Sequence, residues 1–238
     1  MTKIACPRPR NLTAVAAIPA EPTASRLLAS QSRWGRAIKR TGDIVFSLLV
    51  LSLGSPVFLV LAVLVKVSSR GSIFYSQRRI GRGYKAFGCL KFRTMRKDAD
   101  QVLAAVLASS PALRAEFDRD FKLKNDPRIT PIGKFLRRSS LDELPQFINV
   151  LRGQMSVVGP RPIVWAELSR YGRAMDEVLA VRPGLTGLWQ VSGRNNLTYR
   201  QRVRLDLRYT RSRNVWLDLR IILRTVGVVL LPMDRGAY

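Results

Sequence analysis

One uncharged stretch, from Ile44 to Val65, constrains the fold of this chain more than any other part of the sequence. As a helix it would extend roughly 33 Å at about 1.5 Å per residue, close to the ~30 Å hydrocarbon core of a bilayer. Pro56 lies near its middle, where it removes the backbone hydrogen bond to the Ser52 carbonyl oxygen and clashes with the preceding turn. We therefore expect a sharp break of the membrane helix at Ser55 and Pro56.

Positive charges lie on both sides of this stretch, and they bear on its topology. Lys and Arg residues are retained on the cytoplasmic side of membranes, so neither flank should be translocated. We therefore expect a re-entrant helix whose two ends both face the cytoplasm. An ordinary kinked transmembrane helix is the alternative, and a buried helix of a soluble protein fits least because the stretch is apolar on every face. The flanking basic residues are Arg33, Arg36, Lys39 and Arg40 before the stretch, and Lys66, Arg70, Arg78, Arg79, Arg82 and Lys85 after it.

Composition divides the rest of the chain into a tail and one domain. Residues 1–32 are rich in Ala, Pro, Thr and Ser without helical or strand periodicity, and we expect a disordered tail there. The membrane helix and its basic flanks take residues 33–70. Residues 71–238 are long enough for one compact cytosolic domain with its own core.

Short β-like pieces and longer helical ones predict a mixed α/β fold that is mainly helical. Ile73–Tyr75 and Phe87–Phe92 are β-like and flank a glycine-rich turn, whereas residues 98–121 have helical spacing interrupted by a proline. The stretch from Tyr199 to Leu231 sets arginines beside Leu and Trp, which suits amphipathic helices lying in a membrane interface. Packing on the protein's own core is the alternative for its second half, Leu217–Leu230.

The net charge limits the classes of partner that the chain can be expected to bind. The absence of histidine limits the side chains that could act in catalysis or bind a metal. The chain has 41 Lys and Arg against 16 Asp and Glu, a net charge of +25. Its partners should therefore be polyanions such as nucleic acid, anionic lipid headgroups or phosphorylated small molecules. Without histidine, the usual general base and the usual zinc ligand are absent, and two cysteines are too few for a disulfide framework. A carboxylate is then the best candidate for covalent chemistry.

Two adjacent carboxylates, Asp142 and Glu143, stand out because two arginines shortly precede them. Proline is tolerated in the first turn of a helix, so Pro145 places a helix start near Asp142. Either Asp142 is the N-cap, or Ser140 caps the helix and Glu143 completes a capping box. Both alternatives put the pair at a helix N-terminus, which stabilises anions.

A purely structural role is the simplest alternative for such a pair, since an Asp before a helix is most often only a cap. A second adjacent pair, Asp176 and Glu177, serves as a comparison within the chain. It falls inside an expected helix from Glu167 to Leu179, and we assign it to the solvated face of that helix. We take Asp142 and Glu143 as the candidate active site because of their basic surroundings.

Several further residues are candidates for contacts with phosphate. Arg161 lies between two prolines, which hold it in an extended conformation suited to gripping phosphate with a guanidinium fork. Lys91 ends a β-like piece, and a glycine-rich segment, residues 182–195, contains Arg194. Asp218 is unusual as an acidic residue among aliphatic neighbours.

Taken together, these motifs resemble one family of bacterial membrane enzymes, the bacterial sugar transferases, which are small monotopic phosphoglycosyl transferases. Each motif is weak alone, but five in the same order are specific. The ending Arg235-Gly-Ala-Tyr238 further resembles the exopolysaccharide type that transfers galactose phosphate. The matching elements are the apolar stretch broken at Ser55-Pro56, Lys91-Phe-Arg-Thr-Met95, Leu141-Asp-Glu-Leu-Pro-Gln146, Val158-Gly-Pro-Arg-Pro162, and Arg182-Pro-Gly-Leu-Thr-Gly187 with Gly193-Arg-Asn195.

The resemblance implies transfer of a sugar 1-phosphate from UDP-galactose or UDP-glucose to undecaprenyl phosphate, with release of UMP, as the first membrane step of exopolysaccharide assembly. It implies a re-entrant helix in the bacterial inner membrane, with the catalytic domain on the cytoplasmic face. Asp142 would be a nucleophile that forms an aspartyl intermediate, and Glu143 and Asp142 would bind Mg²⁺. The residues expected to bind substrate or support the site are Lys91, Arg137, Arg161, Arg194 and Asp218.

The expected partners are undecaprenyl phosphate, a UDP-sugar and anionic lipids of the inner leaflet, with no role for nucleic acid. A homodimer is compatible with the sequence. The alternative is a non-enzymatic protein that binds membrane surfaces or nucleic acid through its net charge of +25. That alternative does not explain where the acidic residues are placed. A protein that binds nucleic acid also has little need of a long uncharged stretch.

Overall fold

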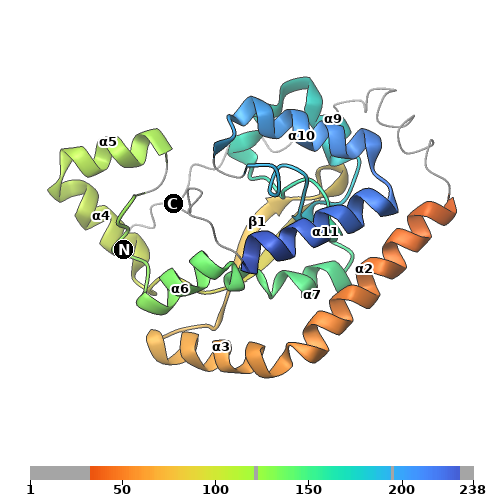
Figure 1. Cartoon of the computed structure of the whole chain (residues 1–238). Helices are drawn as coiled ribbons and strands as arrows, with labels where there is room; N and C mark the ends of the chain where they lie inside the picture. The colour runs from red at the N-terminus through yellow and green to blue at the C-terminus, as the bar shows by residue number, and fades with distance from the viewer. Residues whose placement is uncertain (1–32, 121–122, 194–195, 231–238) are drawn as a thin grey trace.

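The structure is a computed structural model that describes residues 33–120, 123–193 and 196–230. The described residues form mostly helices together with two small two-stranded sheets, which confirms the mixed, mainly helical class. In Figure 1, a bent pair of helices runs along the lower edge of the molecule and the remaining elements lie above it. The expected disordered tail, residues 1–32, lies outside the described part of the chain.

The bent pair consists of α2, Arg33–Leu53, and α3, Ser55–Ser68, which meet at 65°. Pro56 lies in the first turn of α3, where its missing N–H leaves a carbonyl oxygen of α2 without its usual donor. The Ser55 hydroxyl donates to that acceptor, the Ser52 carbonyl oxygen, over 2.8 Å. The predicted break at Ser55 and Pro56 is therefore confirmed.

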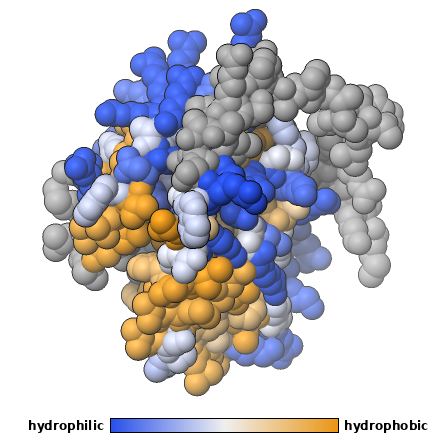
Figure 2. Space-filling model, turned by 90° about the vertical axis from the view of Figure 1, so that its right-hand side faces the viewer, coloured by the Kyte–Doolittle hydropathy of each residue, from blue (hydrophilic) through white to orange (hydrophobic). Residues whose placement is uncertain are grey.

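The bent pair presents a large apolar surface. Among the residues with described coordinates, no single helix is long and apolar enough to cross a membrane, whereas α2 and α3 together are. Figure 2 shows the lower part of one face of the molecule as largely hydrophobic and the upper part as hydrophilic. The exposed apolar side chains of the pair include Val45, Leu48, Leu49, Leu53, Val57, Leu59, Val60, Val63 and Leu64.

An antiparallel hairpin follows the bent pair. It consists of β1, Phe74–Ile80, and β2, Ala86–Phe92, as the two β-like pieces predicted. Gly83 in the connecting turn has a φ of 63°, a left-handed conformation that favours glycine. The register pairs Tyr75 with Lys91, which places Lys91 near the end of β2.

Three helices come next in the chain. α4, Ala99–Ser109, and α5, Pro111–Asp120, extend away from the rest of the molecule in Figure 1, with the predicted interruption between them. α6, Pro131–Ser139, begins after Thr130, whose hydroxyl oxygen accepts a hydrogen bond from the Gly133 N–H over 2.9 Å. This cap defines where α6 starts.

The helix expected to begin near Asp142 begins later. Leu141–Glu143 forms a separate 3₁₀ turn, and α7, Gln146–Leu151, follows with Pro145 as the residue before its first turn. Ser140 adopts a left-handed conformation, with a φ of 58°, at the end of α6, and its side chain caps nothing. Both capping alternatives were therefore wrong, because Ser140 ends α6 and the chain needs a short turn before α7.

Two short parallel strands, β3 Ser156–Val158 and β4 Gly184–Thr186, lie between α7 and the last helices. The segment that joins them was expected to contain one helix from residue 167 to 179. Gly172, with a φ of 52°, interrupts that helix. The pieces are a 3₁₀ turn at Trp165–Glu167, α8 at Leu168–Tyr171, a 3₁₀ turn at Gly172–Ala174, and α9 at Met175–Leu179.

The chain's last described helices are α10, Tyr199–Ser212, and α11, Val215–Leu230. α11 buries Ile221 in the core, while Trp216 on the same helix is 79% exposed. Its exposed apolar side chains also include Val215, Leu219, Leu223 and Val226. The alternative of packing on the protein's own core is therefore confirmed for one face of α11, and a position in a membrane interface stays a prediction for its exposed apolar face.

Three apolar clusters join these elements among the described residues, and two of them bear on the site. The first contains Phe147 and Val150 of α7, together with Tyr209 of α10 and Ile221 of α11. The second contains Leu61 and Val65 of α3, Phe92 of β2 and Leu136 of α6, and it packs α3 against the hairpin. Burying such side chains contributes about 1.5–3 kcal/mol each.

One buried polar side chain, Asn149 of α7, connects α7 to the edge of β2. Its amide nitrogen donates to the Gly88 carbonyl oxygen over 2.7 Å and to Gln154 Oε1 over 2.6 Å. Its amide oxygen accepts from the Leu90 N–H over 2.9 Å. The side chain is fully buried, so these three bonds satisfy groups that water cannot reach.

The Asn149→Ala substitution should destabilise the protein by about 2–4 kcal/mol, because it leaves buried backbone groups of β2 without partners. Denaturant unfolding of the detergent-solubilised protein measures the change. Asn214→Ala is the matched control. The Asn214 side chain accepts from the Leu217 N–H and donates to the Ser212 carbonyl oxygen at the exposed start of α11, and its loss should cost about 1 kcal/mol. Equal costs for the two variants would contradict the proposed role of Asn149.

Asp206 of α10 makes the stability of the fold depend on pH. It is fully buried, accepts a hydrogen bond from the Tyr171 hydroxyl over 2.9 Å, and burial raises its pKa to about 7. The folded protein therefore holds a proton that the unfolded chain loses near pH 4, so the free energy of unfolding should fall as pH rises from about 4 to about 7.

Asp206→Asn should remove this dependence. At about pH 8 the variant should be more stable than the parent by roughly 2–4 kcal/mol, and near pH 4 the two should be alike. Unfolding curves recorded across this pH range give the comparison. A stability difference that stays constant with pH would show that Asp206 does not titrate in this way.

Candidate active site

The two candidate carboxylates lie beside a lysine from the hairpin. Asp142 is buried, with 7% of its surface exposed, and Glu143 is half-buried. The Lys91 ammonium of β2 donates a hydrogen bond to Glu143 Oε1 over 2.6 Å and lies 3.5 Å from Asp142 Oδ2. One cation therefore bridges two carboxylates that are neighbours in the chain.

Burial and the surrounding charges give the two carboxyls different acidities. Burial raises the pKa of the Asp142 carboxyl above its usual value, although Lys91 opposes that shift. Burial acts on Glu143 in the same direction, but Lys91, with Arg161 and Arg79, holds the pKa of that carboxyl below its usual value. Asp142 therefore carries the more basic carboxylate, and Glu143 the more firmly ionised one.

Arg137 brings a positive charge to Asp142 from α6. Its Nε donates a hydrogen bond to the Thr94 hydroxyl oxygen over 2.9 Å, which orients the guanidinium. The charge of Arg137 lowers the pKa of Asp142, so it partly offsets the effect of burial. Lys91 and Arg137 thus face Asp142 from different elements.

Arg161 and Arg79 are the cations that act on Glu143 from the side of β1 and the 159–162 segment. Arg79 is buried and donates a hydrogen bond to the Pro162 carbonyl oxygen over 3.1 Å, directly after Arg161. The same arginine lies 3.7 Å from Glu167. Arg79 therefore holds the backbone that carries Arg161 close to the hairpin.

Trp189 forms a flat, buried surface beside Arg161. The Arg161 guanidinium lies 5.8 Å from the centre of the indole ring, and the Arg202 guanidinium lies 5.0 Å from it. Both distances fall in the range of cation–π contacts. The ring thus helps to position Arg161, which the sequence singled out only for its prolines.

Of the two remaining site residues predicted from sequence, the structure describes only Asp218, which lies outside this group. Arg194 lies outside the described residues. Asp218 of α11 accepts hydrogen bonds from Lys39 over 2.6 Å and from the Tyr209 hydroxyl over 2.8 Å, and neither partner belongs to the carboxylate site. Burial raises the pKa of the Asp218 carboxyl. These contacts join α11 to α2 and α10, which is a structural role.

The comparison pair, Asp176 and Glu177, was assigned to solvent, and that assignment was wrong. Asp176 Oδ1 accepts a hydrogen bond from the Tyr84 hydroxyl over 2.6 Å, and Glu177 forms an ion pair of 2.8 Å with Arg211. The partners are distant in sequence, so no local pattern indicates them. The pair nevertheless differs from Asp142 and Glu143, because each of its carboxylates has a structural partner of its own.

Sequence reasoning also missed residues that build the site. Arg79 was considered only as one of the basic residues after the apolar stretch. Thr94 was noted only as part of the motif Lys91–Met95, and neither residue was predicted to belong to the site. Asn149 holds α7, which follows the carboxylate pair, against the strand that carries Lys91. A polar residue inside an apolar helix, as in Phe147-Ile-Asn-Val150, is the signal that could have identified Asn149.

The carboxylate pair fits a magnesium ion shared with a phosphorylated substrate. No cluster of three or more His, Cys, Asp or Glu side chains suited to a metal occurs within the part of the chain that the structure describes. Mg²⁺ needs only one or two carboxylates when phosphate oxygens complete its coordination. Lys91 contacts one oxygen of each carboxylate, so Asp142 Oδ1 and Glu143 Oε2 are the atoms suited to a metal.

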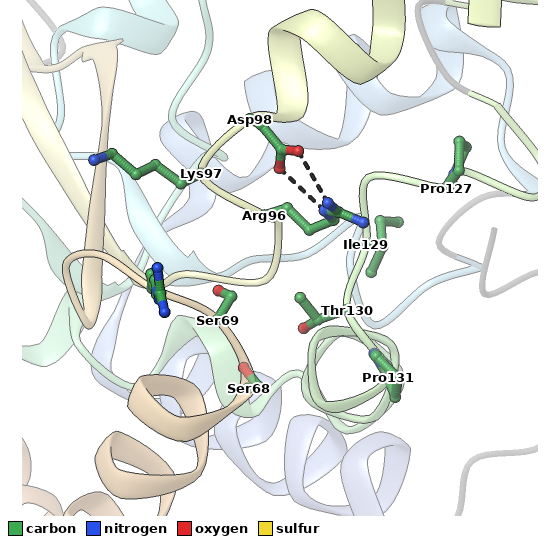
Figure 3. A pocket seen from close by; sticks show the side chains of 10 residues that line it. Ser68, Ser69, Arg96, Lys97, Asp98, Pro127, Ile129, Thr130 and Pro131 are labelled. Carbon is green, nitrogen blue, oxygen red and sulfur yellow. Dashed lines mark hydrogen bonds and ion pairs between the residues drawn. The ribbon is translucent and has the colours of Figure 1, made fainter.

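A cavity of about 480 Å³ lies between the end of α3 and the starts of α4 and α6 (Figure 3). Arg70, Arg96 and Lys97 line it, and Asp98 accepts two hydrogen bonds from Arg96, of 3.0 and 2.9 Å. Neither Lys91 nor the carboxylate pair lines this cavity. It is therefore separate from the candidate active site.

Comparison with known proteins finds several similar chains, among them the following three. A sugar transferase of Haemophilus influenzae with no assigned activity is 53% identical over 203 residues, 85% of this chain and 42% of the relative. The undecaprenyl-phosphate galactose phosphotransferase of Salmonella typhimurium is 50% identical over 206 residues, 87% of this chain and 43% of the relative. The exopolysaccharide production protein ExoY of Sinorhizobium fredii is 45% identical over 229 residues, 96% of this chain and 98% of the relative.

The lengths of these relatives differ. This chain spans less than half of the Haemophilus and Salmonella proteins and nearly all of the Sinorhizobium one. The family described as bacterial sugar transferase matches residues 34–232, which include the bent helix pair, Lys91 and the carboxylate pair. The chain belongs to the bacterial sugar transferase family.

Proposed function

We propose that the protein transfers a sugar 1-phosphate from UDP-galactose or UDP-glucose to undecaprenyl phosphate and releases UMP. The observation that supports this most is the buried Asp142, held beside Glu143 by the Lys91 ammonium and faced by Arg137. The name of the Salmonella relative supports the acceptor and the galactose donor. The name of the Sinorhizobium relative supports a place in exopolysaccharide production.

In the proposed reaction, an oxygen of the Asp142 carboxylate attacks the phosphorus atom that carries the sugar. A bond forms between that oxygen and the phosphorus, the bond from the phosphorus to the UMP oxygen breaks, and UMP leaves with the electron pair. An oxygen of undecaprenyl phosphate then attacks the same phosphorus and displaces Asp142, which restores the carboxylate. Two displacements suit a site that has a carboxylate nucleophile in a chain without histidine.

Repulsion between an anionic nucleophile and an anionic diphosphate is the main obstacle to this reaction. Lys91 and Arg137 place positive charge at Asp142, and Arg161 places it at Glu143. Preorganised cations of this kind stabilise the charge that spreads over the equatorial phosphate oxygens in the transition state. Arg161 can add a two-pronged grip on one phosphate, because its guanidinium is planar.

Mg²⁺ is the proposed cofactor. Asp142 and Glu143 would hold it through the oxygens that Lys91 does not contact. When bound, the ion would neutralise diphosphate charge and help UMP to leave. Glu143 suits this role, because its lowered pKa keeps it ionised over the physiological pH range.

We further propose that α2 and α3 form a re-entrant element in the bacterial inner membrane, with the catalytic domain on the cytoplasmic face. The 65° bend and the basic residues at both ends support entry and exit on the same side. The exposed apolar face of α11, with Trp216 at its start, suits a helix lying in the membrane interface. The acceptor phosphate would then meet Asp142 at the membrane surface.

A non-enzymatic role in binding nucleic acid or membrane surfaces remains the competing hypothesis, on the ground of the net charge of +25. This hypothesis does not explain why Lys91 contacts two adjacent carboxylates, one buried and one half-buried. Salt-dependent binding of duplex DNA by a protein that releases no UMP from any UDP-sugar would favour it.

Asp142→Asn should lower turnover by at least about a thousandfold, as expected when a covalent nucleophile is removed. The purified protein is incubated with Mg²⁺, undecaprenyl phosphate and a set of UDP-sugars, and UMP release is measured. The same assay identifies the preferred sugar.

Glu177→Gln is the matched control for this prediction, since it removes one member of the other adjacent acidic pair. Only its exposed ion pair with Arg211 is lost, and such pairs contribute about 0–1 kcal/mol, so turnover should stay at the parent rate. Parent-like turnover by Asp142→Asn would exclude Asp142 as the nucleophile.

A further inference from the structure

Basic side chains from separate parts of the chain meet around a pocket of about 70 Å³ beside α2. Three come from α2, one from the turn of the hairpin, one from the segment before β4, and one from the end of α10. We refer to them as the α2 basic cluster, which consists of Arg36, Lys39, Arg40, Arg82, Arg182 and Arg213.

Cations outnumber carboxylates in the described lining of this pocket. Asp43 lines the pocket and accepts a hydrogen bond from the Ser156 hydroxyl over 2.8 Å. Asp218 accepts one from Lys39 over 2.6 Å. Among the residues that the structure describes, Asp43 is the one Asp or Glu that lines the pocket, and Asp218 reaches the cluster through Lys39.

The cations of the cluster lie close enough to repel one another. Burial lowers the pKa of the Arg182 guanidinium, and the charges of Arg82 and Arg40 lower it further. Burial also lowers the pKa of Arg213, and Arg36 and Arg82 act in the same direction. A bound anion would relieve this repulsion.

Hydrogen bonds to the protein backbone hold part of the cluster in place. Arg40 donates to the Val150 and Leu151 carbonyl oxygens over 2.7 and 3.1 Å, at the end of α7. Arg182 Nε donates to the Gly153 carbonyl oxygen over 2.8 Å. These anchors lie at the opposite end of α7 from the carboxylate pair, roughly 9 Å away along the helix axis, so the cluster is distinct from the candidate active site.

The cluster lies at the edge of the apolar surface of the molecule. On α2, Arg40 precedes the exposed Val45 by five residues, or about 7.5 Å along the helix. Trp216 is exposed shortly after Arg213, and tryptophan favours the membrane–water interface. The polar headgroup layer on each side of a bilayer is about 5–7 Å thick, which is the depth at which these arginines would lie.

We propose that the α2 basic cluster binds a phosphate-bearing anion, and that this anion is the headgroup of an anionic membrane lipid. The proposal rests on the membrane arrangement proposed above, because that arrangement places the pocket in the headgroup layer. Phosphate chemistry fits the arginine-rich lining, since guanidinium groups recognise phosphate oxygens in pairs. A tightly held lipid would fix the angle at which α2 enters the membrane.

Lipid binding to the full-length, detergent-solubilised protein tests this proposal. Phosphatidylglycerol and phosphatidylcholine are titrated separately, and native mass spectrometry gives the bound fraction. Arg82→Gln is the test variant, because Arg82 is exposed and its side chain makes no hydrogen bond to the described residues, so the variant should fold. Arg204→Gln is the matched control, since it removes the same charge from an exposed position of α10 outside the cluster.

Arg82→Gln should weaken phosphatidylglycerol binding about fivefold, the effect of one basic residue near a membrane surface, and Arg204→Gln should leave it unchanged. Equal binding by the parent and both variants, or an equal loss in both variants, would overturn the proposal. A second titration uses inorganic pyrophosphate without lipid, and thermal unfolding reports binding. The contrary result is that pyrophosphate raises the unfolding temperature of the parent but not of Arg82→Gln, while neither protein binds lipid selectively. That result would assign the site to a soluble phosphate and overturn the lipid assignment.

UMP release is measured on the same samples, so this test is separate from that of the proposed transferase activity. Selective lipid binding by a parent protein that releases no UMP would support the lipid site and contradict the transferase. UMP release without selective binding of lipid or pyrophosphate would support the transferase and contradict the lipid site.

Discussion

The site depends on one electrostatic constraint, which is that two like-charged carboxyl groups stand next to each other, one buried and the other half-buried. Burial and mutual repulsion both disfavour the ionised forms of Asp142 and Glu143. Lys91 offsets both effects, since its ammonium lies 2.6 Å from Glu143 Oε1 and 3.5 Å from Asp142 Oδ2. Burial still dominates at Asp142, whose pKa is raised, while the cations dominate at Glu143, whose pKa is lowered. The result is a basic carboxylate beside a firmly ionised one, which suits a nucleophile beside a metal ligand.

The rest of the fold keeps Lys91 in register with the carboxylates, which follow it by 51 and 52 residues. Asn149 joins α7 to β2 through two buried hydrogen bonds and donates a third to Gln154, so the turn before α7 stays beside the strand that carries Lys91. Phe92, the next residue of β2, packs against Leu61 and Val65 of α3. α3 therefore packs against the same strand that carries Lys91.

Features set by local covalent geometry could be predicted from the sequence, whereas features set by distant partners could not. The break at Pro56 was predictable because a missing N–H acts within one turn of helix. The start of α7 was not, because Ser140 takes a left-handed conformation that is uncommon for residues other than glycine. Arg79 was missed because its carbonyl partner lies 83 residues away. Similarly, nothing near Glu177 indicates its ion pair with Arg211, 34 residues later. The acidic pair of the site was found because its basic neighbours are close in sequence.

The central claim is that Asp142 becomes covalently attached to the sugar phosphate, and trapping that species tests it most directly. The protein is incubated with Mg²⁺ and the preferred UDP-sugar in the absence of undecaprenyl phosphate, then digested and analysed by peptide mass spectrometry. We expect UMP release of at most one equivalent and a sugar-phosphate adduct on the peptide that contains Asp142, with the fragment ions assigning it to that residue. UMP release that requires the acceptor, or an adduct on any other residue, would contradict the claim.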